Sequence, residues 1–146
     1  MKNFSDFLNS NQNNISQSEC KDRNSLVFAF VGDAVFTLFV RSYLAETSTA
    51  KAGILHTEAS KFVRASYQKK LLDLLENSLK DDEKSIVITA RNAHTNNIAK
   101  NSNLEEYKKS TSFEAVIGYL YLTGKNDRLL EILDICKQQM EKELWK

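Results

Sequence analysis

Two acidic residues stand in stretches that otherwise consist of core-forming side chains. Asp33 interrupts the apolar run FAFVGDAVFTLFV, residues 28–40, and Glu114 interrupts STSFEAVIGYLYL, residues 110–122. An ionised carboxylate is costly to bury without a partner. Two of them on apolar helices therefore indicate either cationic side chains between them or a bound divalent ion, and oxygen ligands suit magnesium. Because magnesium also binds substrate phosphates, such a site would suit phosphodiester hydrolysis.

A purely structural interpretation of these acids is also open. Asp33, Thr37 and Arg41 are spaced by four residues and form a narrow polar stripe on an otherwise apolar helix. In that interpretation Asp33 pairs with Arg41 or another buried base, and Glu114 is an ion-paired core residue as well. A structural helical module of this kind would show no effect of magnesium on stability or activity.

The elements that would position the two acids are predicted to be helices. The 146 residues include no proline and only four glycines, and apolar residues recur at helical spacing from Ser25 onward. This pattern predicts one all-α domain. Its expected helices cover residues 25–46, 49–57, 58–76, 80–99, 103–123 and 126–145. Gly124 provides one of the clearest breaks, since glycine is a natural residue at the C-terminus of a helix.

The first 24 residues differ in composition from the rest of the chain. They are rich in Asn, Ser and Gln, with Phe4, Phe7 and Leu8 as the one early apolar cluster. Such a composition predicts a poorly packed polar leader over residues 1–24 that contains at most a short helix. The folded domain is then expected to cover residues 25–146.

Charge and cysteine content argue against several classes of protein. With 20 Lys and Arg against 19 Asp and Glu, the net charge of +1 supplies no overall basic field, so a nucleic acid would have to be met by local patches. Cys20 and Cys136 lack zinc-site spacing, and no signal-peptide core is visible, so a reducing cytoplasm is expected. The apolar run over residues 26–44 is long enough for a membrane span, but Asp33 and Arg41 within it argue against one.

Several motifs together resemble the ribonuclease III catalytic domain. FVGDAVFTLFVRSYL, residues 30–44, looks like the signature helix of that family, and TSFEAVIGYLYL, residues 111–122, resembles its later conserved helix. Between them, LHTEASKFVRASYQKKLLDLL and ARNAH are similar to a small bacterial subfamily, Mini-ribonuclease III, which lacks the C-terminal double-stranded RNA-binding domain. The resemblance covers roughly residues 25–135.

This resemblance implies an all-α, ribonuclease III-type endonuclease domain that forms a homodimer and cleaves double-stranded RNA. Asp33 and Glu114 match the family's metal-ligating acids, so they would be the catalytic residues and would bind Mg²⁺, with Mn²⁺ as a substitute. Cleavage would leave 5′-phosphate and 3′-hydroxyl ends, and the subfamily implies a structured RNA, a precursor of ribosomal RNA, as the substrate. The resemblance also makes Phe28, Phe36 and Phe39 candidates for subunit contacts, with core packing as an equally weighted alternative.

Two departures from the family's pattern leave the number of metal ions open. Ala29 stands where a glutamate is expected four residues before Asp33, and Thr111 stands where an aspartate is expected three residues before Glu114. Thr111 could hold a water at the metal or, like Ser110, cap the N-terminus of a helix. Mini-ribonuclease III proteins resemble the chain at both positions, which favours an active enzyme. A non-catalytic, double-stranded RNA-binding homodimer of the same fold is the alternative.

Candidate RNA contacts lie in the basic segments that precede the Glu114 helix, since phosphate binding requires placed cations. They are Arg91, Asn92, His94, Lys100, Lys108 and Lys109. The segment from Arg91 to Lys100 is favoured because it matches the basic loop region of the subfamily. For each of these residues, a solvated surface position is the alternative.

Overall fold

The computed structural model describes residues 2–10, 14–93 and 103–146, and these ranges contain helices but no strand. In chain order the elements are α1 (Lys2–Ser10), α2 (Gln17–Cys20), α3 (Ser25–Thr47), α4 (Ala52–Val63), α5 (Ala65–Leu75), the short 3₁₀ helix η1 (Glu76–Ser78), α6 (Asp81–Asn92), α7 (Leu104–Leu122) and α8 (Asn126–Glu141). The prediction of an all-α fold is confirmed.

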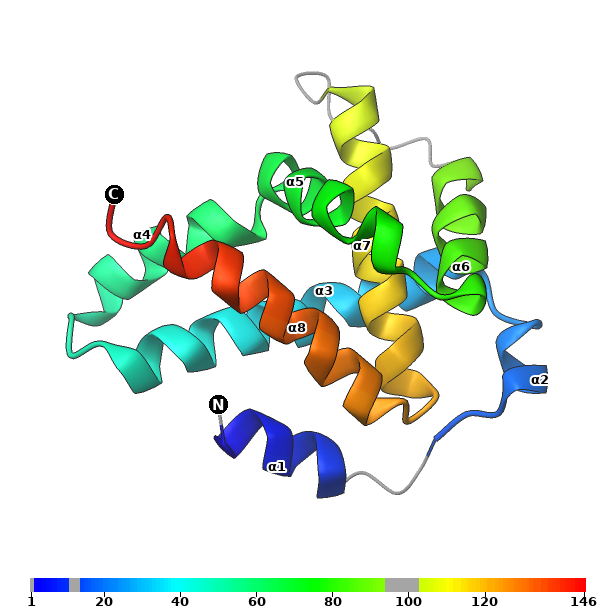
Figure 1. The fold of residues 1–146 in the computed structure, drawn as a ribbon, viewed down its shortest axis with the longest axis horizontal. Coiled ribbons are helices and arrows are strands. Elements are labelled where there is room, and N and C mark those ends of the chain that lie inside the picture. The colour runs from blue at the N-terminus through cyan, green and yellow to red at the C-terminus, as the bar shows by residue number, and fades with distance from the viewer. Residues whose placement is uncertain (1, 11–13, 94–102) are drawn as a thin grey trace.

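Two long helices, α3 and α7, form the centre of the molecule. Figure 1 shows α7 crossing α3, with α5 and α6 on either side of α7. At the crossing the two backbones touch: a Cβ atom at Gly32 would lie 1.7 Å from the carbonyl oxygen of Glu114, and one at Gly118 would lie 1.8 Å from that of Phe28. Only glycine permits so close an approach. The crossing therefore brings Asp33, which follows Gly32, to the turn of α7 that carries Glu114.

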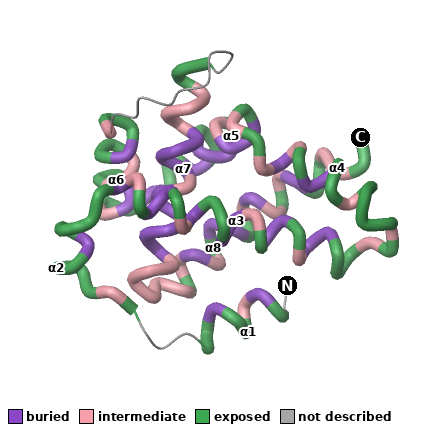
Figure 2. Tube along the Cα trace, turned by 180° about the vertical axis from the view of Figure 1, so that it is seen from behind, coloured by how far each residue is buried: buried purple, intermediate pink, exposed green. Residues whose placement is uncertain are grey.

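Three phenylalanines of α3 fill the core. Phe28, Phe36 and Phe39 are buried within a single chain, and Figure 2 shows buried residues along both α3 and α7. Phe36 packs edge-on against Phe113 of α7, with 5.0 Å between the ring centroids. The prediction of subunit contacts by Phe28, Phe36 and Phe39 is therefore wrong, and their alternative as core residues is confirmed.

By length and hydropathy α3 could cross a membrane, and it is the one helix of the described chain for which this holds. It lies at the centre of the fold, however, where it packs against α7, α4 and α6. The central helix of a protein core has the same length and composition as a membrane span. The position of α3 therefore supports the prediction against a membrane span.

The break between α4 and α5 lies later in the chain than predicted. α4 continues past residue 57 to Val63, and the chain turns at Arg64, whose backbone is extended with φ −76° and ψ 157°. Neither glycine nor proline marks this turn, so the local sequence holds no clear signal for it. The rings of Phe62 and Tyr67, on either side of the turn, pack edge-on with centroids 5.0 Å apart. The packing of these two rings therefore determines where the helix breaks.

The predicted helix over residues 80–99 is too long, because α6 ends at Asn92.

The N-terminal segment is better packed than its polar composition predicts. α1 buries Phe4 and Leu8 in the core and contacts α3 and α8. The ring of Phe4 packs edge-on against Phe39, with 5.6 Å between centroids. Apolar residues at helical spacing are enough to hold one face of a short helix on the core. The expectation of a poorly packed leader is therefore wrong for α1, while a division of the chain at residue 24 stays a prediction.

Candidate active site

Asp33 and Glu114 lie side by side where α3 crosses α7. Asp33 is exposed and Glu114 is partly buried, and their carboxyl groups are within hydrogen-bonding reach of each other. Burial first, and then the neighbouring Asp33 carboxylate, raise the pKa of Glu114 to about 9. The two acids singled out in the sequence therefore form one pair that is open to solvent on the Asp33 side.

This acidic pair has no cationic partner in the part of the chain that the structure describes. No described Lys or Arg forms an ion pair with Asp33 or Glu114. Arg41 is exposed and lies at an apolar cavity between α3 and α4. The structural interpretation in which Asp33 pairs with Arg41 is therefore wrong.

The pair has the chemistry of a divalent-metal site. Two neighbouring carboxylates cannot both ionise at low cost unless a cation joins them. Among the described residues no cluster of three or more His, Cys, Asp or Glu side chains is formed, so the protein would supply two carboxylates. Hard cations such as Mg²⁺ commonly take one or two protein carboxylates and complete their shell with water and substrate phosphate. The residues at the crossing fit such an ion.

A third polar side chain at this site was missed by the sequence analysis. Gln68 of α5 is only 2% exposed, and it lies against Glu114, whose pKa it lowers in opposition to burial. Its Oε1 accepts a hydrogen bond of 2.8 Å from Ser110 Oγ, while its Nε2 is buried without a partner in hydrogen-bonding geometry. A signal was present in the sequence, because Gln68 lies at helical spacing from Leu71 and Leu75 and so falls on the buried face of its helix.

The two positions where family acids are absent supply no carboxylate. Ala29 is buried on α3. Thr111 is buried on α7, and its hydroxyl donates to the carbonyl oxygen of Tyr107 at 2.9 Å. Because α7 begins at Leu104 and is capped by Asn103, the predicted capping role of Thr111 and its neighbour Ser110 is wrong.

Arg91 and Lys108, two of the predicted RNA contacts, are brought together by the fold. Both line a cavity of about 410 Å³ between the end of α6 and the start of α7, and Asn92 is exposed next to Arg91. His94 and Lys100 lie outside the described residues. Glu105 lines the same cavity, so the described part of this group places two cations and one carboxylate where a phosphate could approach.

Lys109 has a different environment. Its ammonium group pairs with Asp73 of α5 and lies 3.6 Å from Glu76, and its side chain is 17% exposed. Asp73 raises the pKa of Lys109 through this hydrogen bond. Lys109 therefore joins α5 to α7, and it is not a free cation for RNA.

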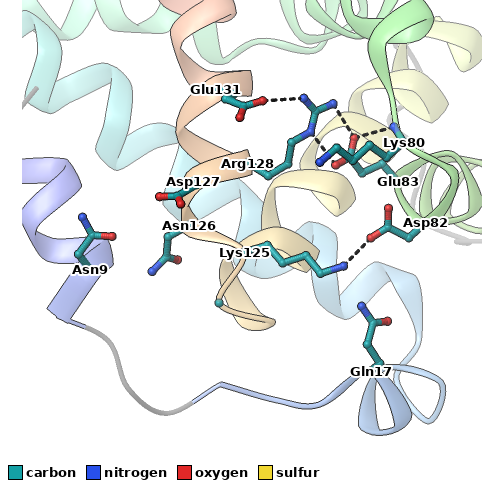
Figure 3. Close-up of a pocket in the computed structure, with 11 residues that line it drawn as sticks. Asn9, Gln17, Lys80, Asp82, Glu83, Lys125, Asn126, Asp127, Arg128 and Glu131 are labelled. Atoms are coloured by element: carbon teal, nitrogen blue, oxygen red, sulfur yellow. Dashed lines mark hydrogen bonds and ion pairs between the residues drawn. The ribbon is translucent and has the colours of Figure 1, made fainter.

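A larger cavity, of about 780 Å³, lies between α6 and the start of α8, and neither Asp33 nor Glu114 lines it (Figure 3). Arg128 donates to the two carboxylate oxygens of the buried Glu83 at 2.8 and 2.9 Å, and Lys125 pairs with Asp82 at 2.6 Å. Both cations are paired, and the network joins α6 to Lys125 and to Arg128 in the first turn of α8. It belongs to the structure of the fold rather than to the acidic pair.

Removal of the Glu114 carboxyl group should change how stability depends on pH in the presence of chelator. The pKa of Glu114 is raised from 4.5 to about 9 in the folded protein, so between these values the folded state keeps a proton that the unfolded state loses. The free energy of unfolding of the wild type should therefore fall, relative to Glu114→Gln, as the pH rises through this window. Urea unfolding of both proteins at several pH values measures this; a constant difference would contradict the raised pKa.

Comparisons with known proteins identify the family. Residues 26–125 match the model of the Ribonuclease III domain. A Mini-ribonuclease 3 from Brevibacillus brevis is 41% identical over 110 residues, which cover 75% of this chain and 82% of that protein. A second, from Streptococcus pneumoniae, is 38% identical over 120 residues, covering 81% and 94%. A crystal structure of a protein from Fusobacterium nucleatum has the same fold, with a TM-score of 0.75 at 29% identity over 83% of this chain and 97% of that chain. The chain therefore belongs to the ribonuclease III family of metal-dependent endoribonucleases, which act on double-stranded RNA.

Proposed function

We propose that this endoribonuclease uses Asp33 and Glu114 to bind the Mg²⁺ ion that supports cleavage. The observation that carries the proposal is the acidic pair at the α3–α7 crossing, which has one exposed member and no cationic partner among the described residues. A divalent cation bound there would lower the pKa of a water molecule and neutralise the scissile phosphate. Mn²⁺ is expected to substitute because it accepts the same oxygen ligands.

The protein's own contribution is to hold the two carboxylates in place. The contact of Gly32 with the backbone of α7 fixes the distance between the helices. Asp33 faces solvent, where an RNA backbone can approach, and Glu114 is supported from α5 by Gln68. Because Glu114 binds a proton when no cation is present, metal affinity should rise with pH.

The proposed substrate is a duplex region of a ribosomal RNA precursor in the cytoplasm, with 5′-phosphate and 3′-hydroxyl product ends. The similarity to Mini-ribonuclease 3 proteins supports this substrate class. A-form RNA offers phosphates and 2′-hydroxyl groups rather than a readable major groove. Cations at the end of α6 and the start of α7 would therefore fix the duplex through its backbone.

Incubation with a long RNA duplex tests the proposal. The purified protein should cut the duplex with Mg²⁺ or Mn²⁺, leave 5′-phosphate ends, and lose this activity in chelator. Binding of the duplex without cleavage under any of these metals would contradict the proposal and favour the non-catalytic, RNA-binding alternative.

Replacement of Arg91 or Lys108 by Ala should weaken duplex binding and reduce the slope of log K against log salt concentration by about 1 for each residue. Lys109→Ala is the matched control, since Lys109 is paired with Asp73 and should leave the slope unchanged. Fluorescence anisotropy of a labelled duplex in chelator, over a series of NaCl concentrations, measures the slopes. An equal effect of all three substitutions would contradict the assignment of Arg91 and Lys108 to phosphate.

The proposed homodimer has a different candidate interface from the one predicted. Val27, Phe30 and Leu38 are large apolar residues of α3 that are exposed, Phe30 to 79%. With the exposed Ala34 they are spaced three or four residues apart, so they form one stripe along the helix. An exposed apolar stripe on the helix that also carries Asp33 supports self-association across this face.

Phe30→Glu should shift the protein from dimer to monomer, raising the dimer dissociation constant by at least about tenfold, because a charge would be buried in the interface. Sedimentation equilibrium measures the constant. Ile54→Glu is the matched control, since Ile54 is 55% exposed on a different helix, α4. If both variants dimerise like the wild type, the α3 stripe is not the interface.

A further inference from the structure

The Gln68 amide has an environment that core packing does not explain. Its Nε2 is the one buried side-chain polar atom among the described residues that has no hydrogen-bond partner. A buried N–H group without an acceptor is costly, and a leucine or methionine at this position of α5 would avoid that cost. The unpartnered donor therefore indicates a ligand state in which it is used.

The Gln68 amide bonds to Ser110 through its oxygen and turns its nitrogen away from that hydroxyl group. Ser110 and Glu114 are four residues apart on α7, so they share one face of the helix, and Gln68 approaches this face from α5. Because Oε1 of Gln68 accepts the Ser110 hydroxyl proton at 2.8 Å, the donor end is left for the carboxyl group. Once Glu114 is ionised, as a metal ligand must be, the reverse orientation would set the amide oxygen against a carboxylate oxygen, and both are acceptors.

Glu114 can accept this donor while it binds a cation. A metal-bound carboxylate uses one or two lone pairs for the ion and keeps others for hydrogen bonds. Outer partners of this kind fix the orientation of a ligand and tune its affinity. The Gln68 amide lies against the Glu114 carboxyl group, so its free donor is placed to bind the ionised form.

The first turn of α5 holds Gln68 rigidly enough for this role. The backbone N–H of Gln68 donates to the Arg64 carbonyl oxygen at 3.1 Å. The adjacent Tyr67 donates from its hydroxyl to Glu143 at 2.7 Å. A supporting residue that is itself fixed can fix the ligand that it touches.

From these contacts we infer that Gln68 is a positioning residue, which donates from Nε2 to Glu114 and orients that carboxylate for the metal. The hydrogen bond from Ser110 holds the Gln68 amide in place for this role. The inference rests on the proposed function, because it takes Glu114 as a metal ligand. It extends the site from two acids to a chain of contacts that runs from Ser110 through Gln68 to Glu114.

Gln68→Met tests the inference, because methionine has a similar length and no donor. Mn²⁺ binding to the variant without RNA, followed by electron paramagnetic resonance, should be weakened at least about tenfold. Cleavage of a long duplex should show kcat lowered by about 10- to 100-fold, with KM for RNA within about twofold of the wild-type value. In chelator, the unfolding temperature should change little, since the substitution removes the unsatisfied Nε2 donor but also takes the acceptor from the buried Ser110 hydroxyl group.

Ser112→Ala is the matched control for a lost buried hydroxyl group on the same helix. Ser112 is buried and donates to the Val87 carbonyl oxygen at 2.9 Å, so its removal should leave Mn²⁺ affinity and kcat unchanged. Ser110→Ala, which removes the hydrogen bond that holds the Gln68 amide, should weaken Mn²⁺ binding relative to Ser112→Ala by more than about twofold and up to about tenfold. This serine pair carries the test if Gln68→Met does not fold.

The inference is overturned if Gln68→Met binds Mn²⁺ and cleaves within about twofold of the wild type, or if KM changes in place of kcat. Equal Mn²⁺ affinities of the two serine variants would overturn it as well. If the wild type neither binds Mn²⁺ nor cleaves the duplex, the proposed function fails first, and the inference falls with it.

Discussion

Asp33→Asn and Glu114→Gln are each expected to lower kcat for duplex cleavage by about 10²- to 10³-fold. Each substitution keeps the size of the side chain but removes a charge from the pair at the α3–α7 crossing. A bound cation contributes several kcal/mol to transition-state stabilisation, and each 1.4 kcal/mol, roughly, corresponds to a factor of ten in rate. Single-turnover cleavage of a long duplex with Mg²⁺ measures the loss.

Two exposed acids of α8 offer matched controls for this experiment. Asp127→Asn and Glu131→Gln change the net charge by the same amount, and so have a similar effect on long-range attraction to RNA. Both controls should cleave like the wild type. Cleavage by Asp33→Asn within about tenfold of these controls would show that Asp33 does not bind the catalytic metal.

Stability separates a catalytic role of these acids from a structural one. In chelator, Glu114→Gln should unfold at the same temperature as the wild type or a higher one, because it removes a partly buried acid beside a second carboxylate. A strongly destabilised Glu114→Gln would support a structural role instead. Thermal unfolding followed by circular dichroism distinguishes the two results.

Gly118→Ala is expected to lower the free energy of unfolding by more than about 3 kcal/mol. Added methylene groups in a packed core usually cost about 1–3 kcal/mol, when side chains can move aside. Here the new Cβ would lie 1.8 Å from the backbone carbonyl oxygen of Phe28, so the two helices themselves must separate. Urea unfolding in chelator measures the loss.

Gly53→Ala is the control for the replacement of a helical glycine at a position where there is space for a Cβ atom. Gly53 lies in α4, and a Cβ there would meet nothing within 4 Å, so alanine should stabilise the protein by about 0.5–1 kcal/mol. Equal effects of the two substitutions would contradict the close crossing. Under conditions in which Gly118→Ala remains folded, its kcat should also fall, because the separation of the helices moves Asp33 away from Glu114.

Helical periodicity predicted most of the fold. Apolar spacing located α3 and α7 to within one residue at most of their ends, because both helices are long and bury a broad face. Gly124, which was predicted to end a helix, follows α7 with φ 70°. The turn at Arg64 was not predictable in the same way, since its extended backbone depends on how Phe62 and Tyr67 pack.

The candidate site was predicted only in part. Asp33 and Glu114 were recognisable because a carboxyl group inside an apolar helix is costly and needs a reason. Gln68 falls on the buried face of its helix with Leu71 and Leu75, but an amide beside Lys69 and Lys70 contrasts less with its neighbours than a carboxyl group in an apolar run. The sequence groups Lys109 with the candidate RNA contacts because both Lys108 and Lys109 precede Glu114, yet the ammonium group of Lys109 pairs with Asp73.

The helical fold class, the two acids and the family to which their motifs belong could all be predicted from the amino-acid sequence. These features are local, because periodicity and the cost of burying a charge can be read within one segment. The tertiary structure alone decided that Asp33 meets Glu114, that Gln68 supports it, and that Phe30 rather than Phe28 is exposed. Each of these depends on where two distant helices cross and how each is rotated, and a step of one residue along a helix turns a side chain by about 100°.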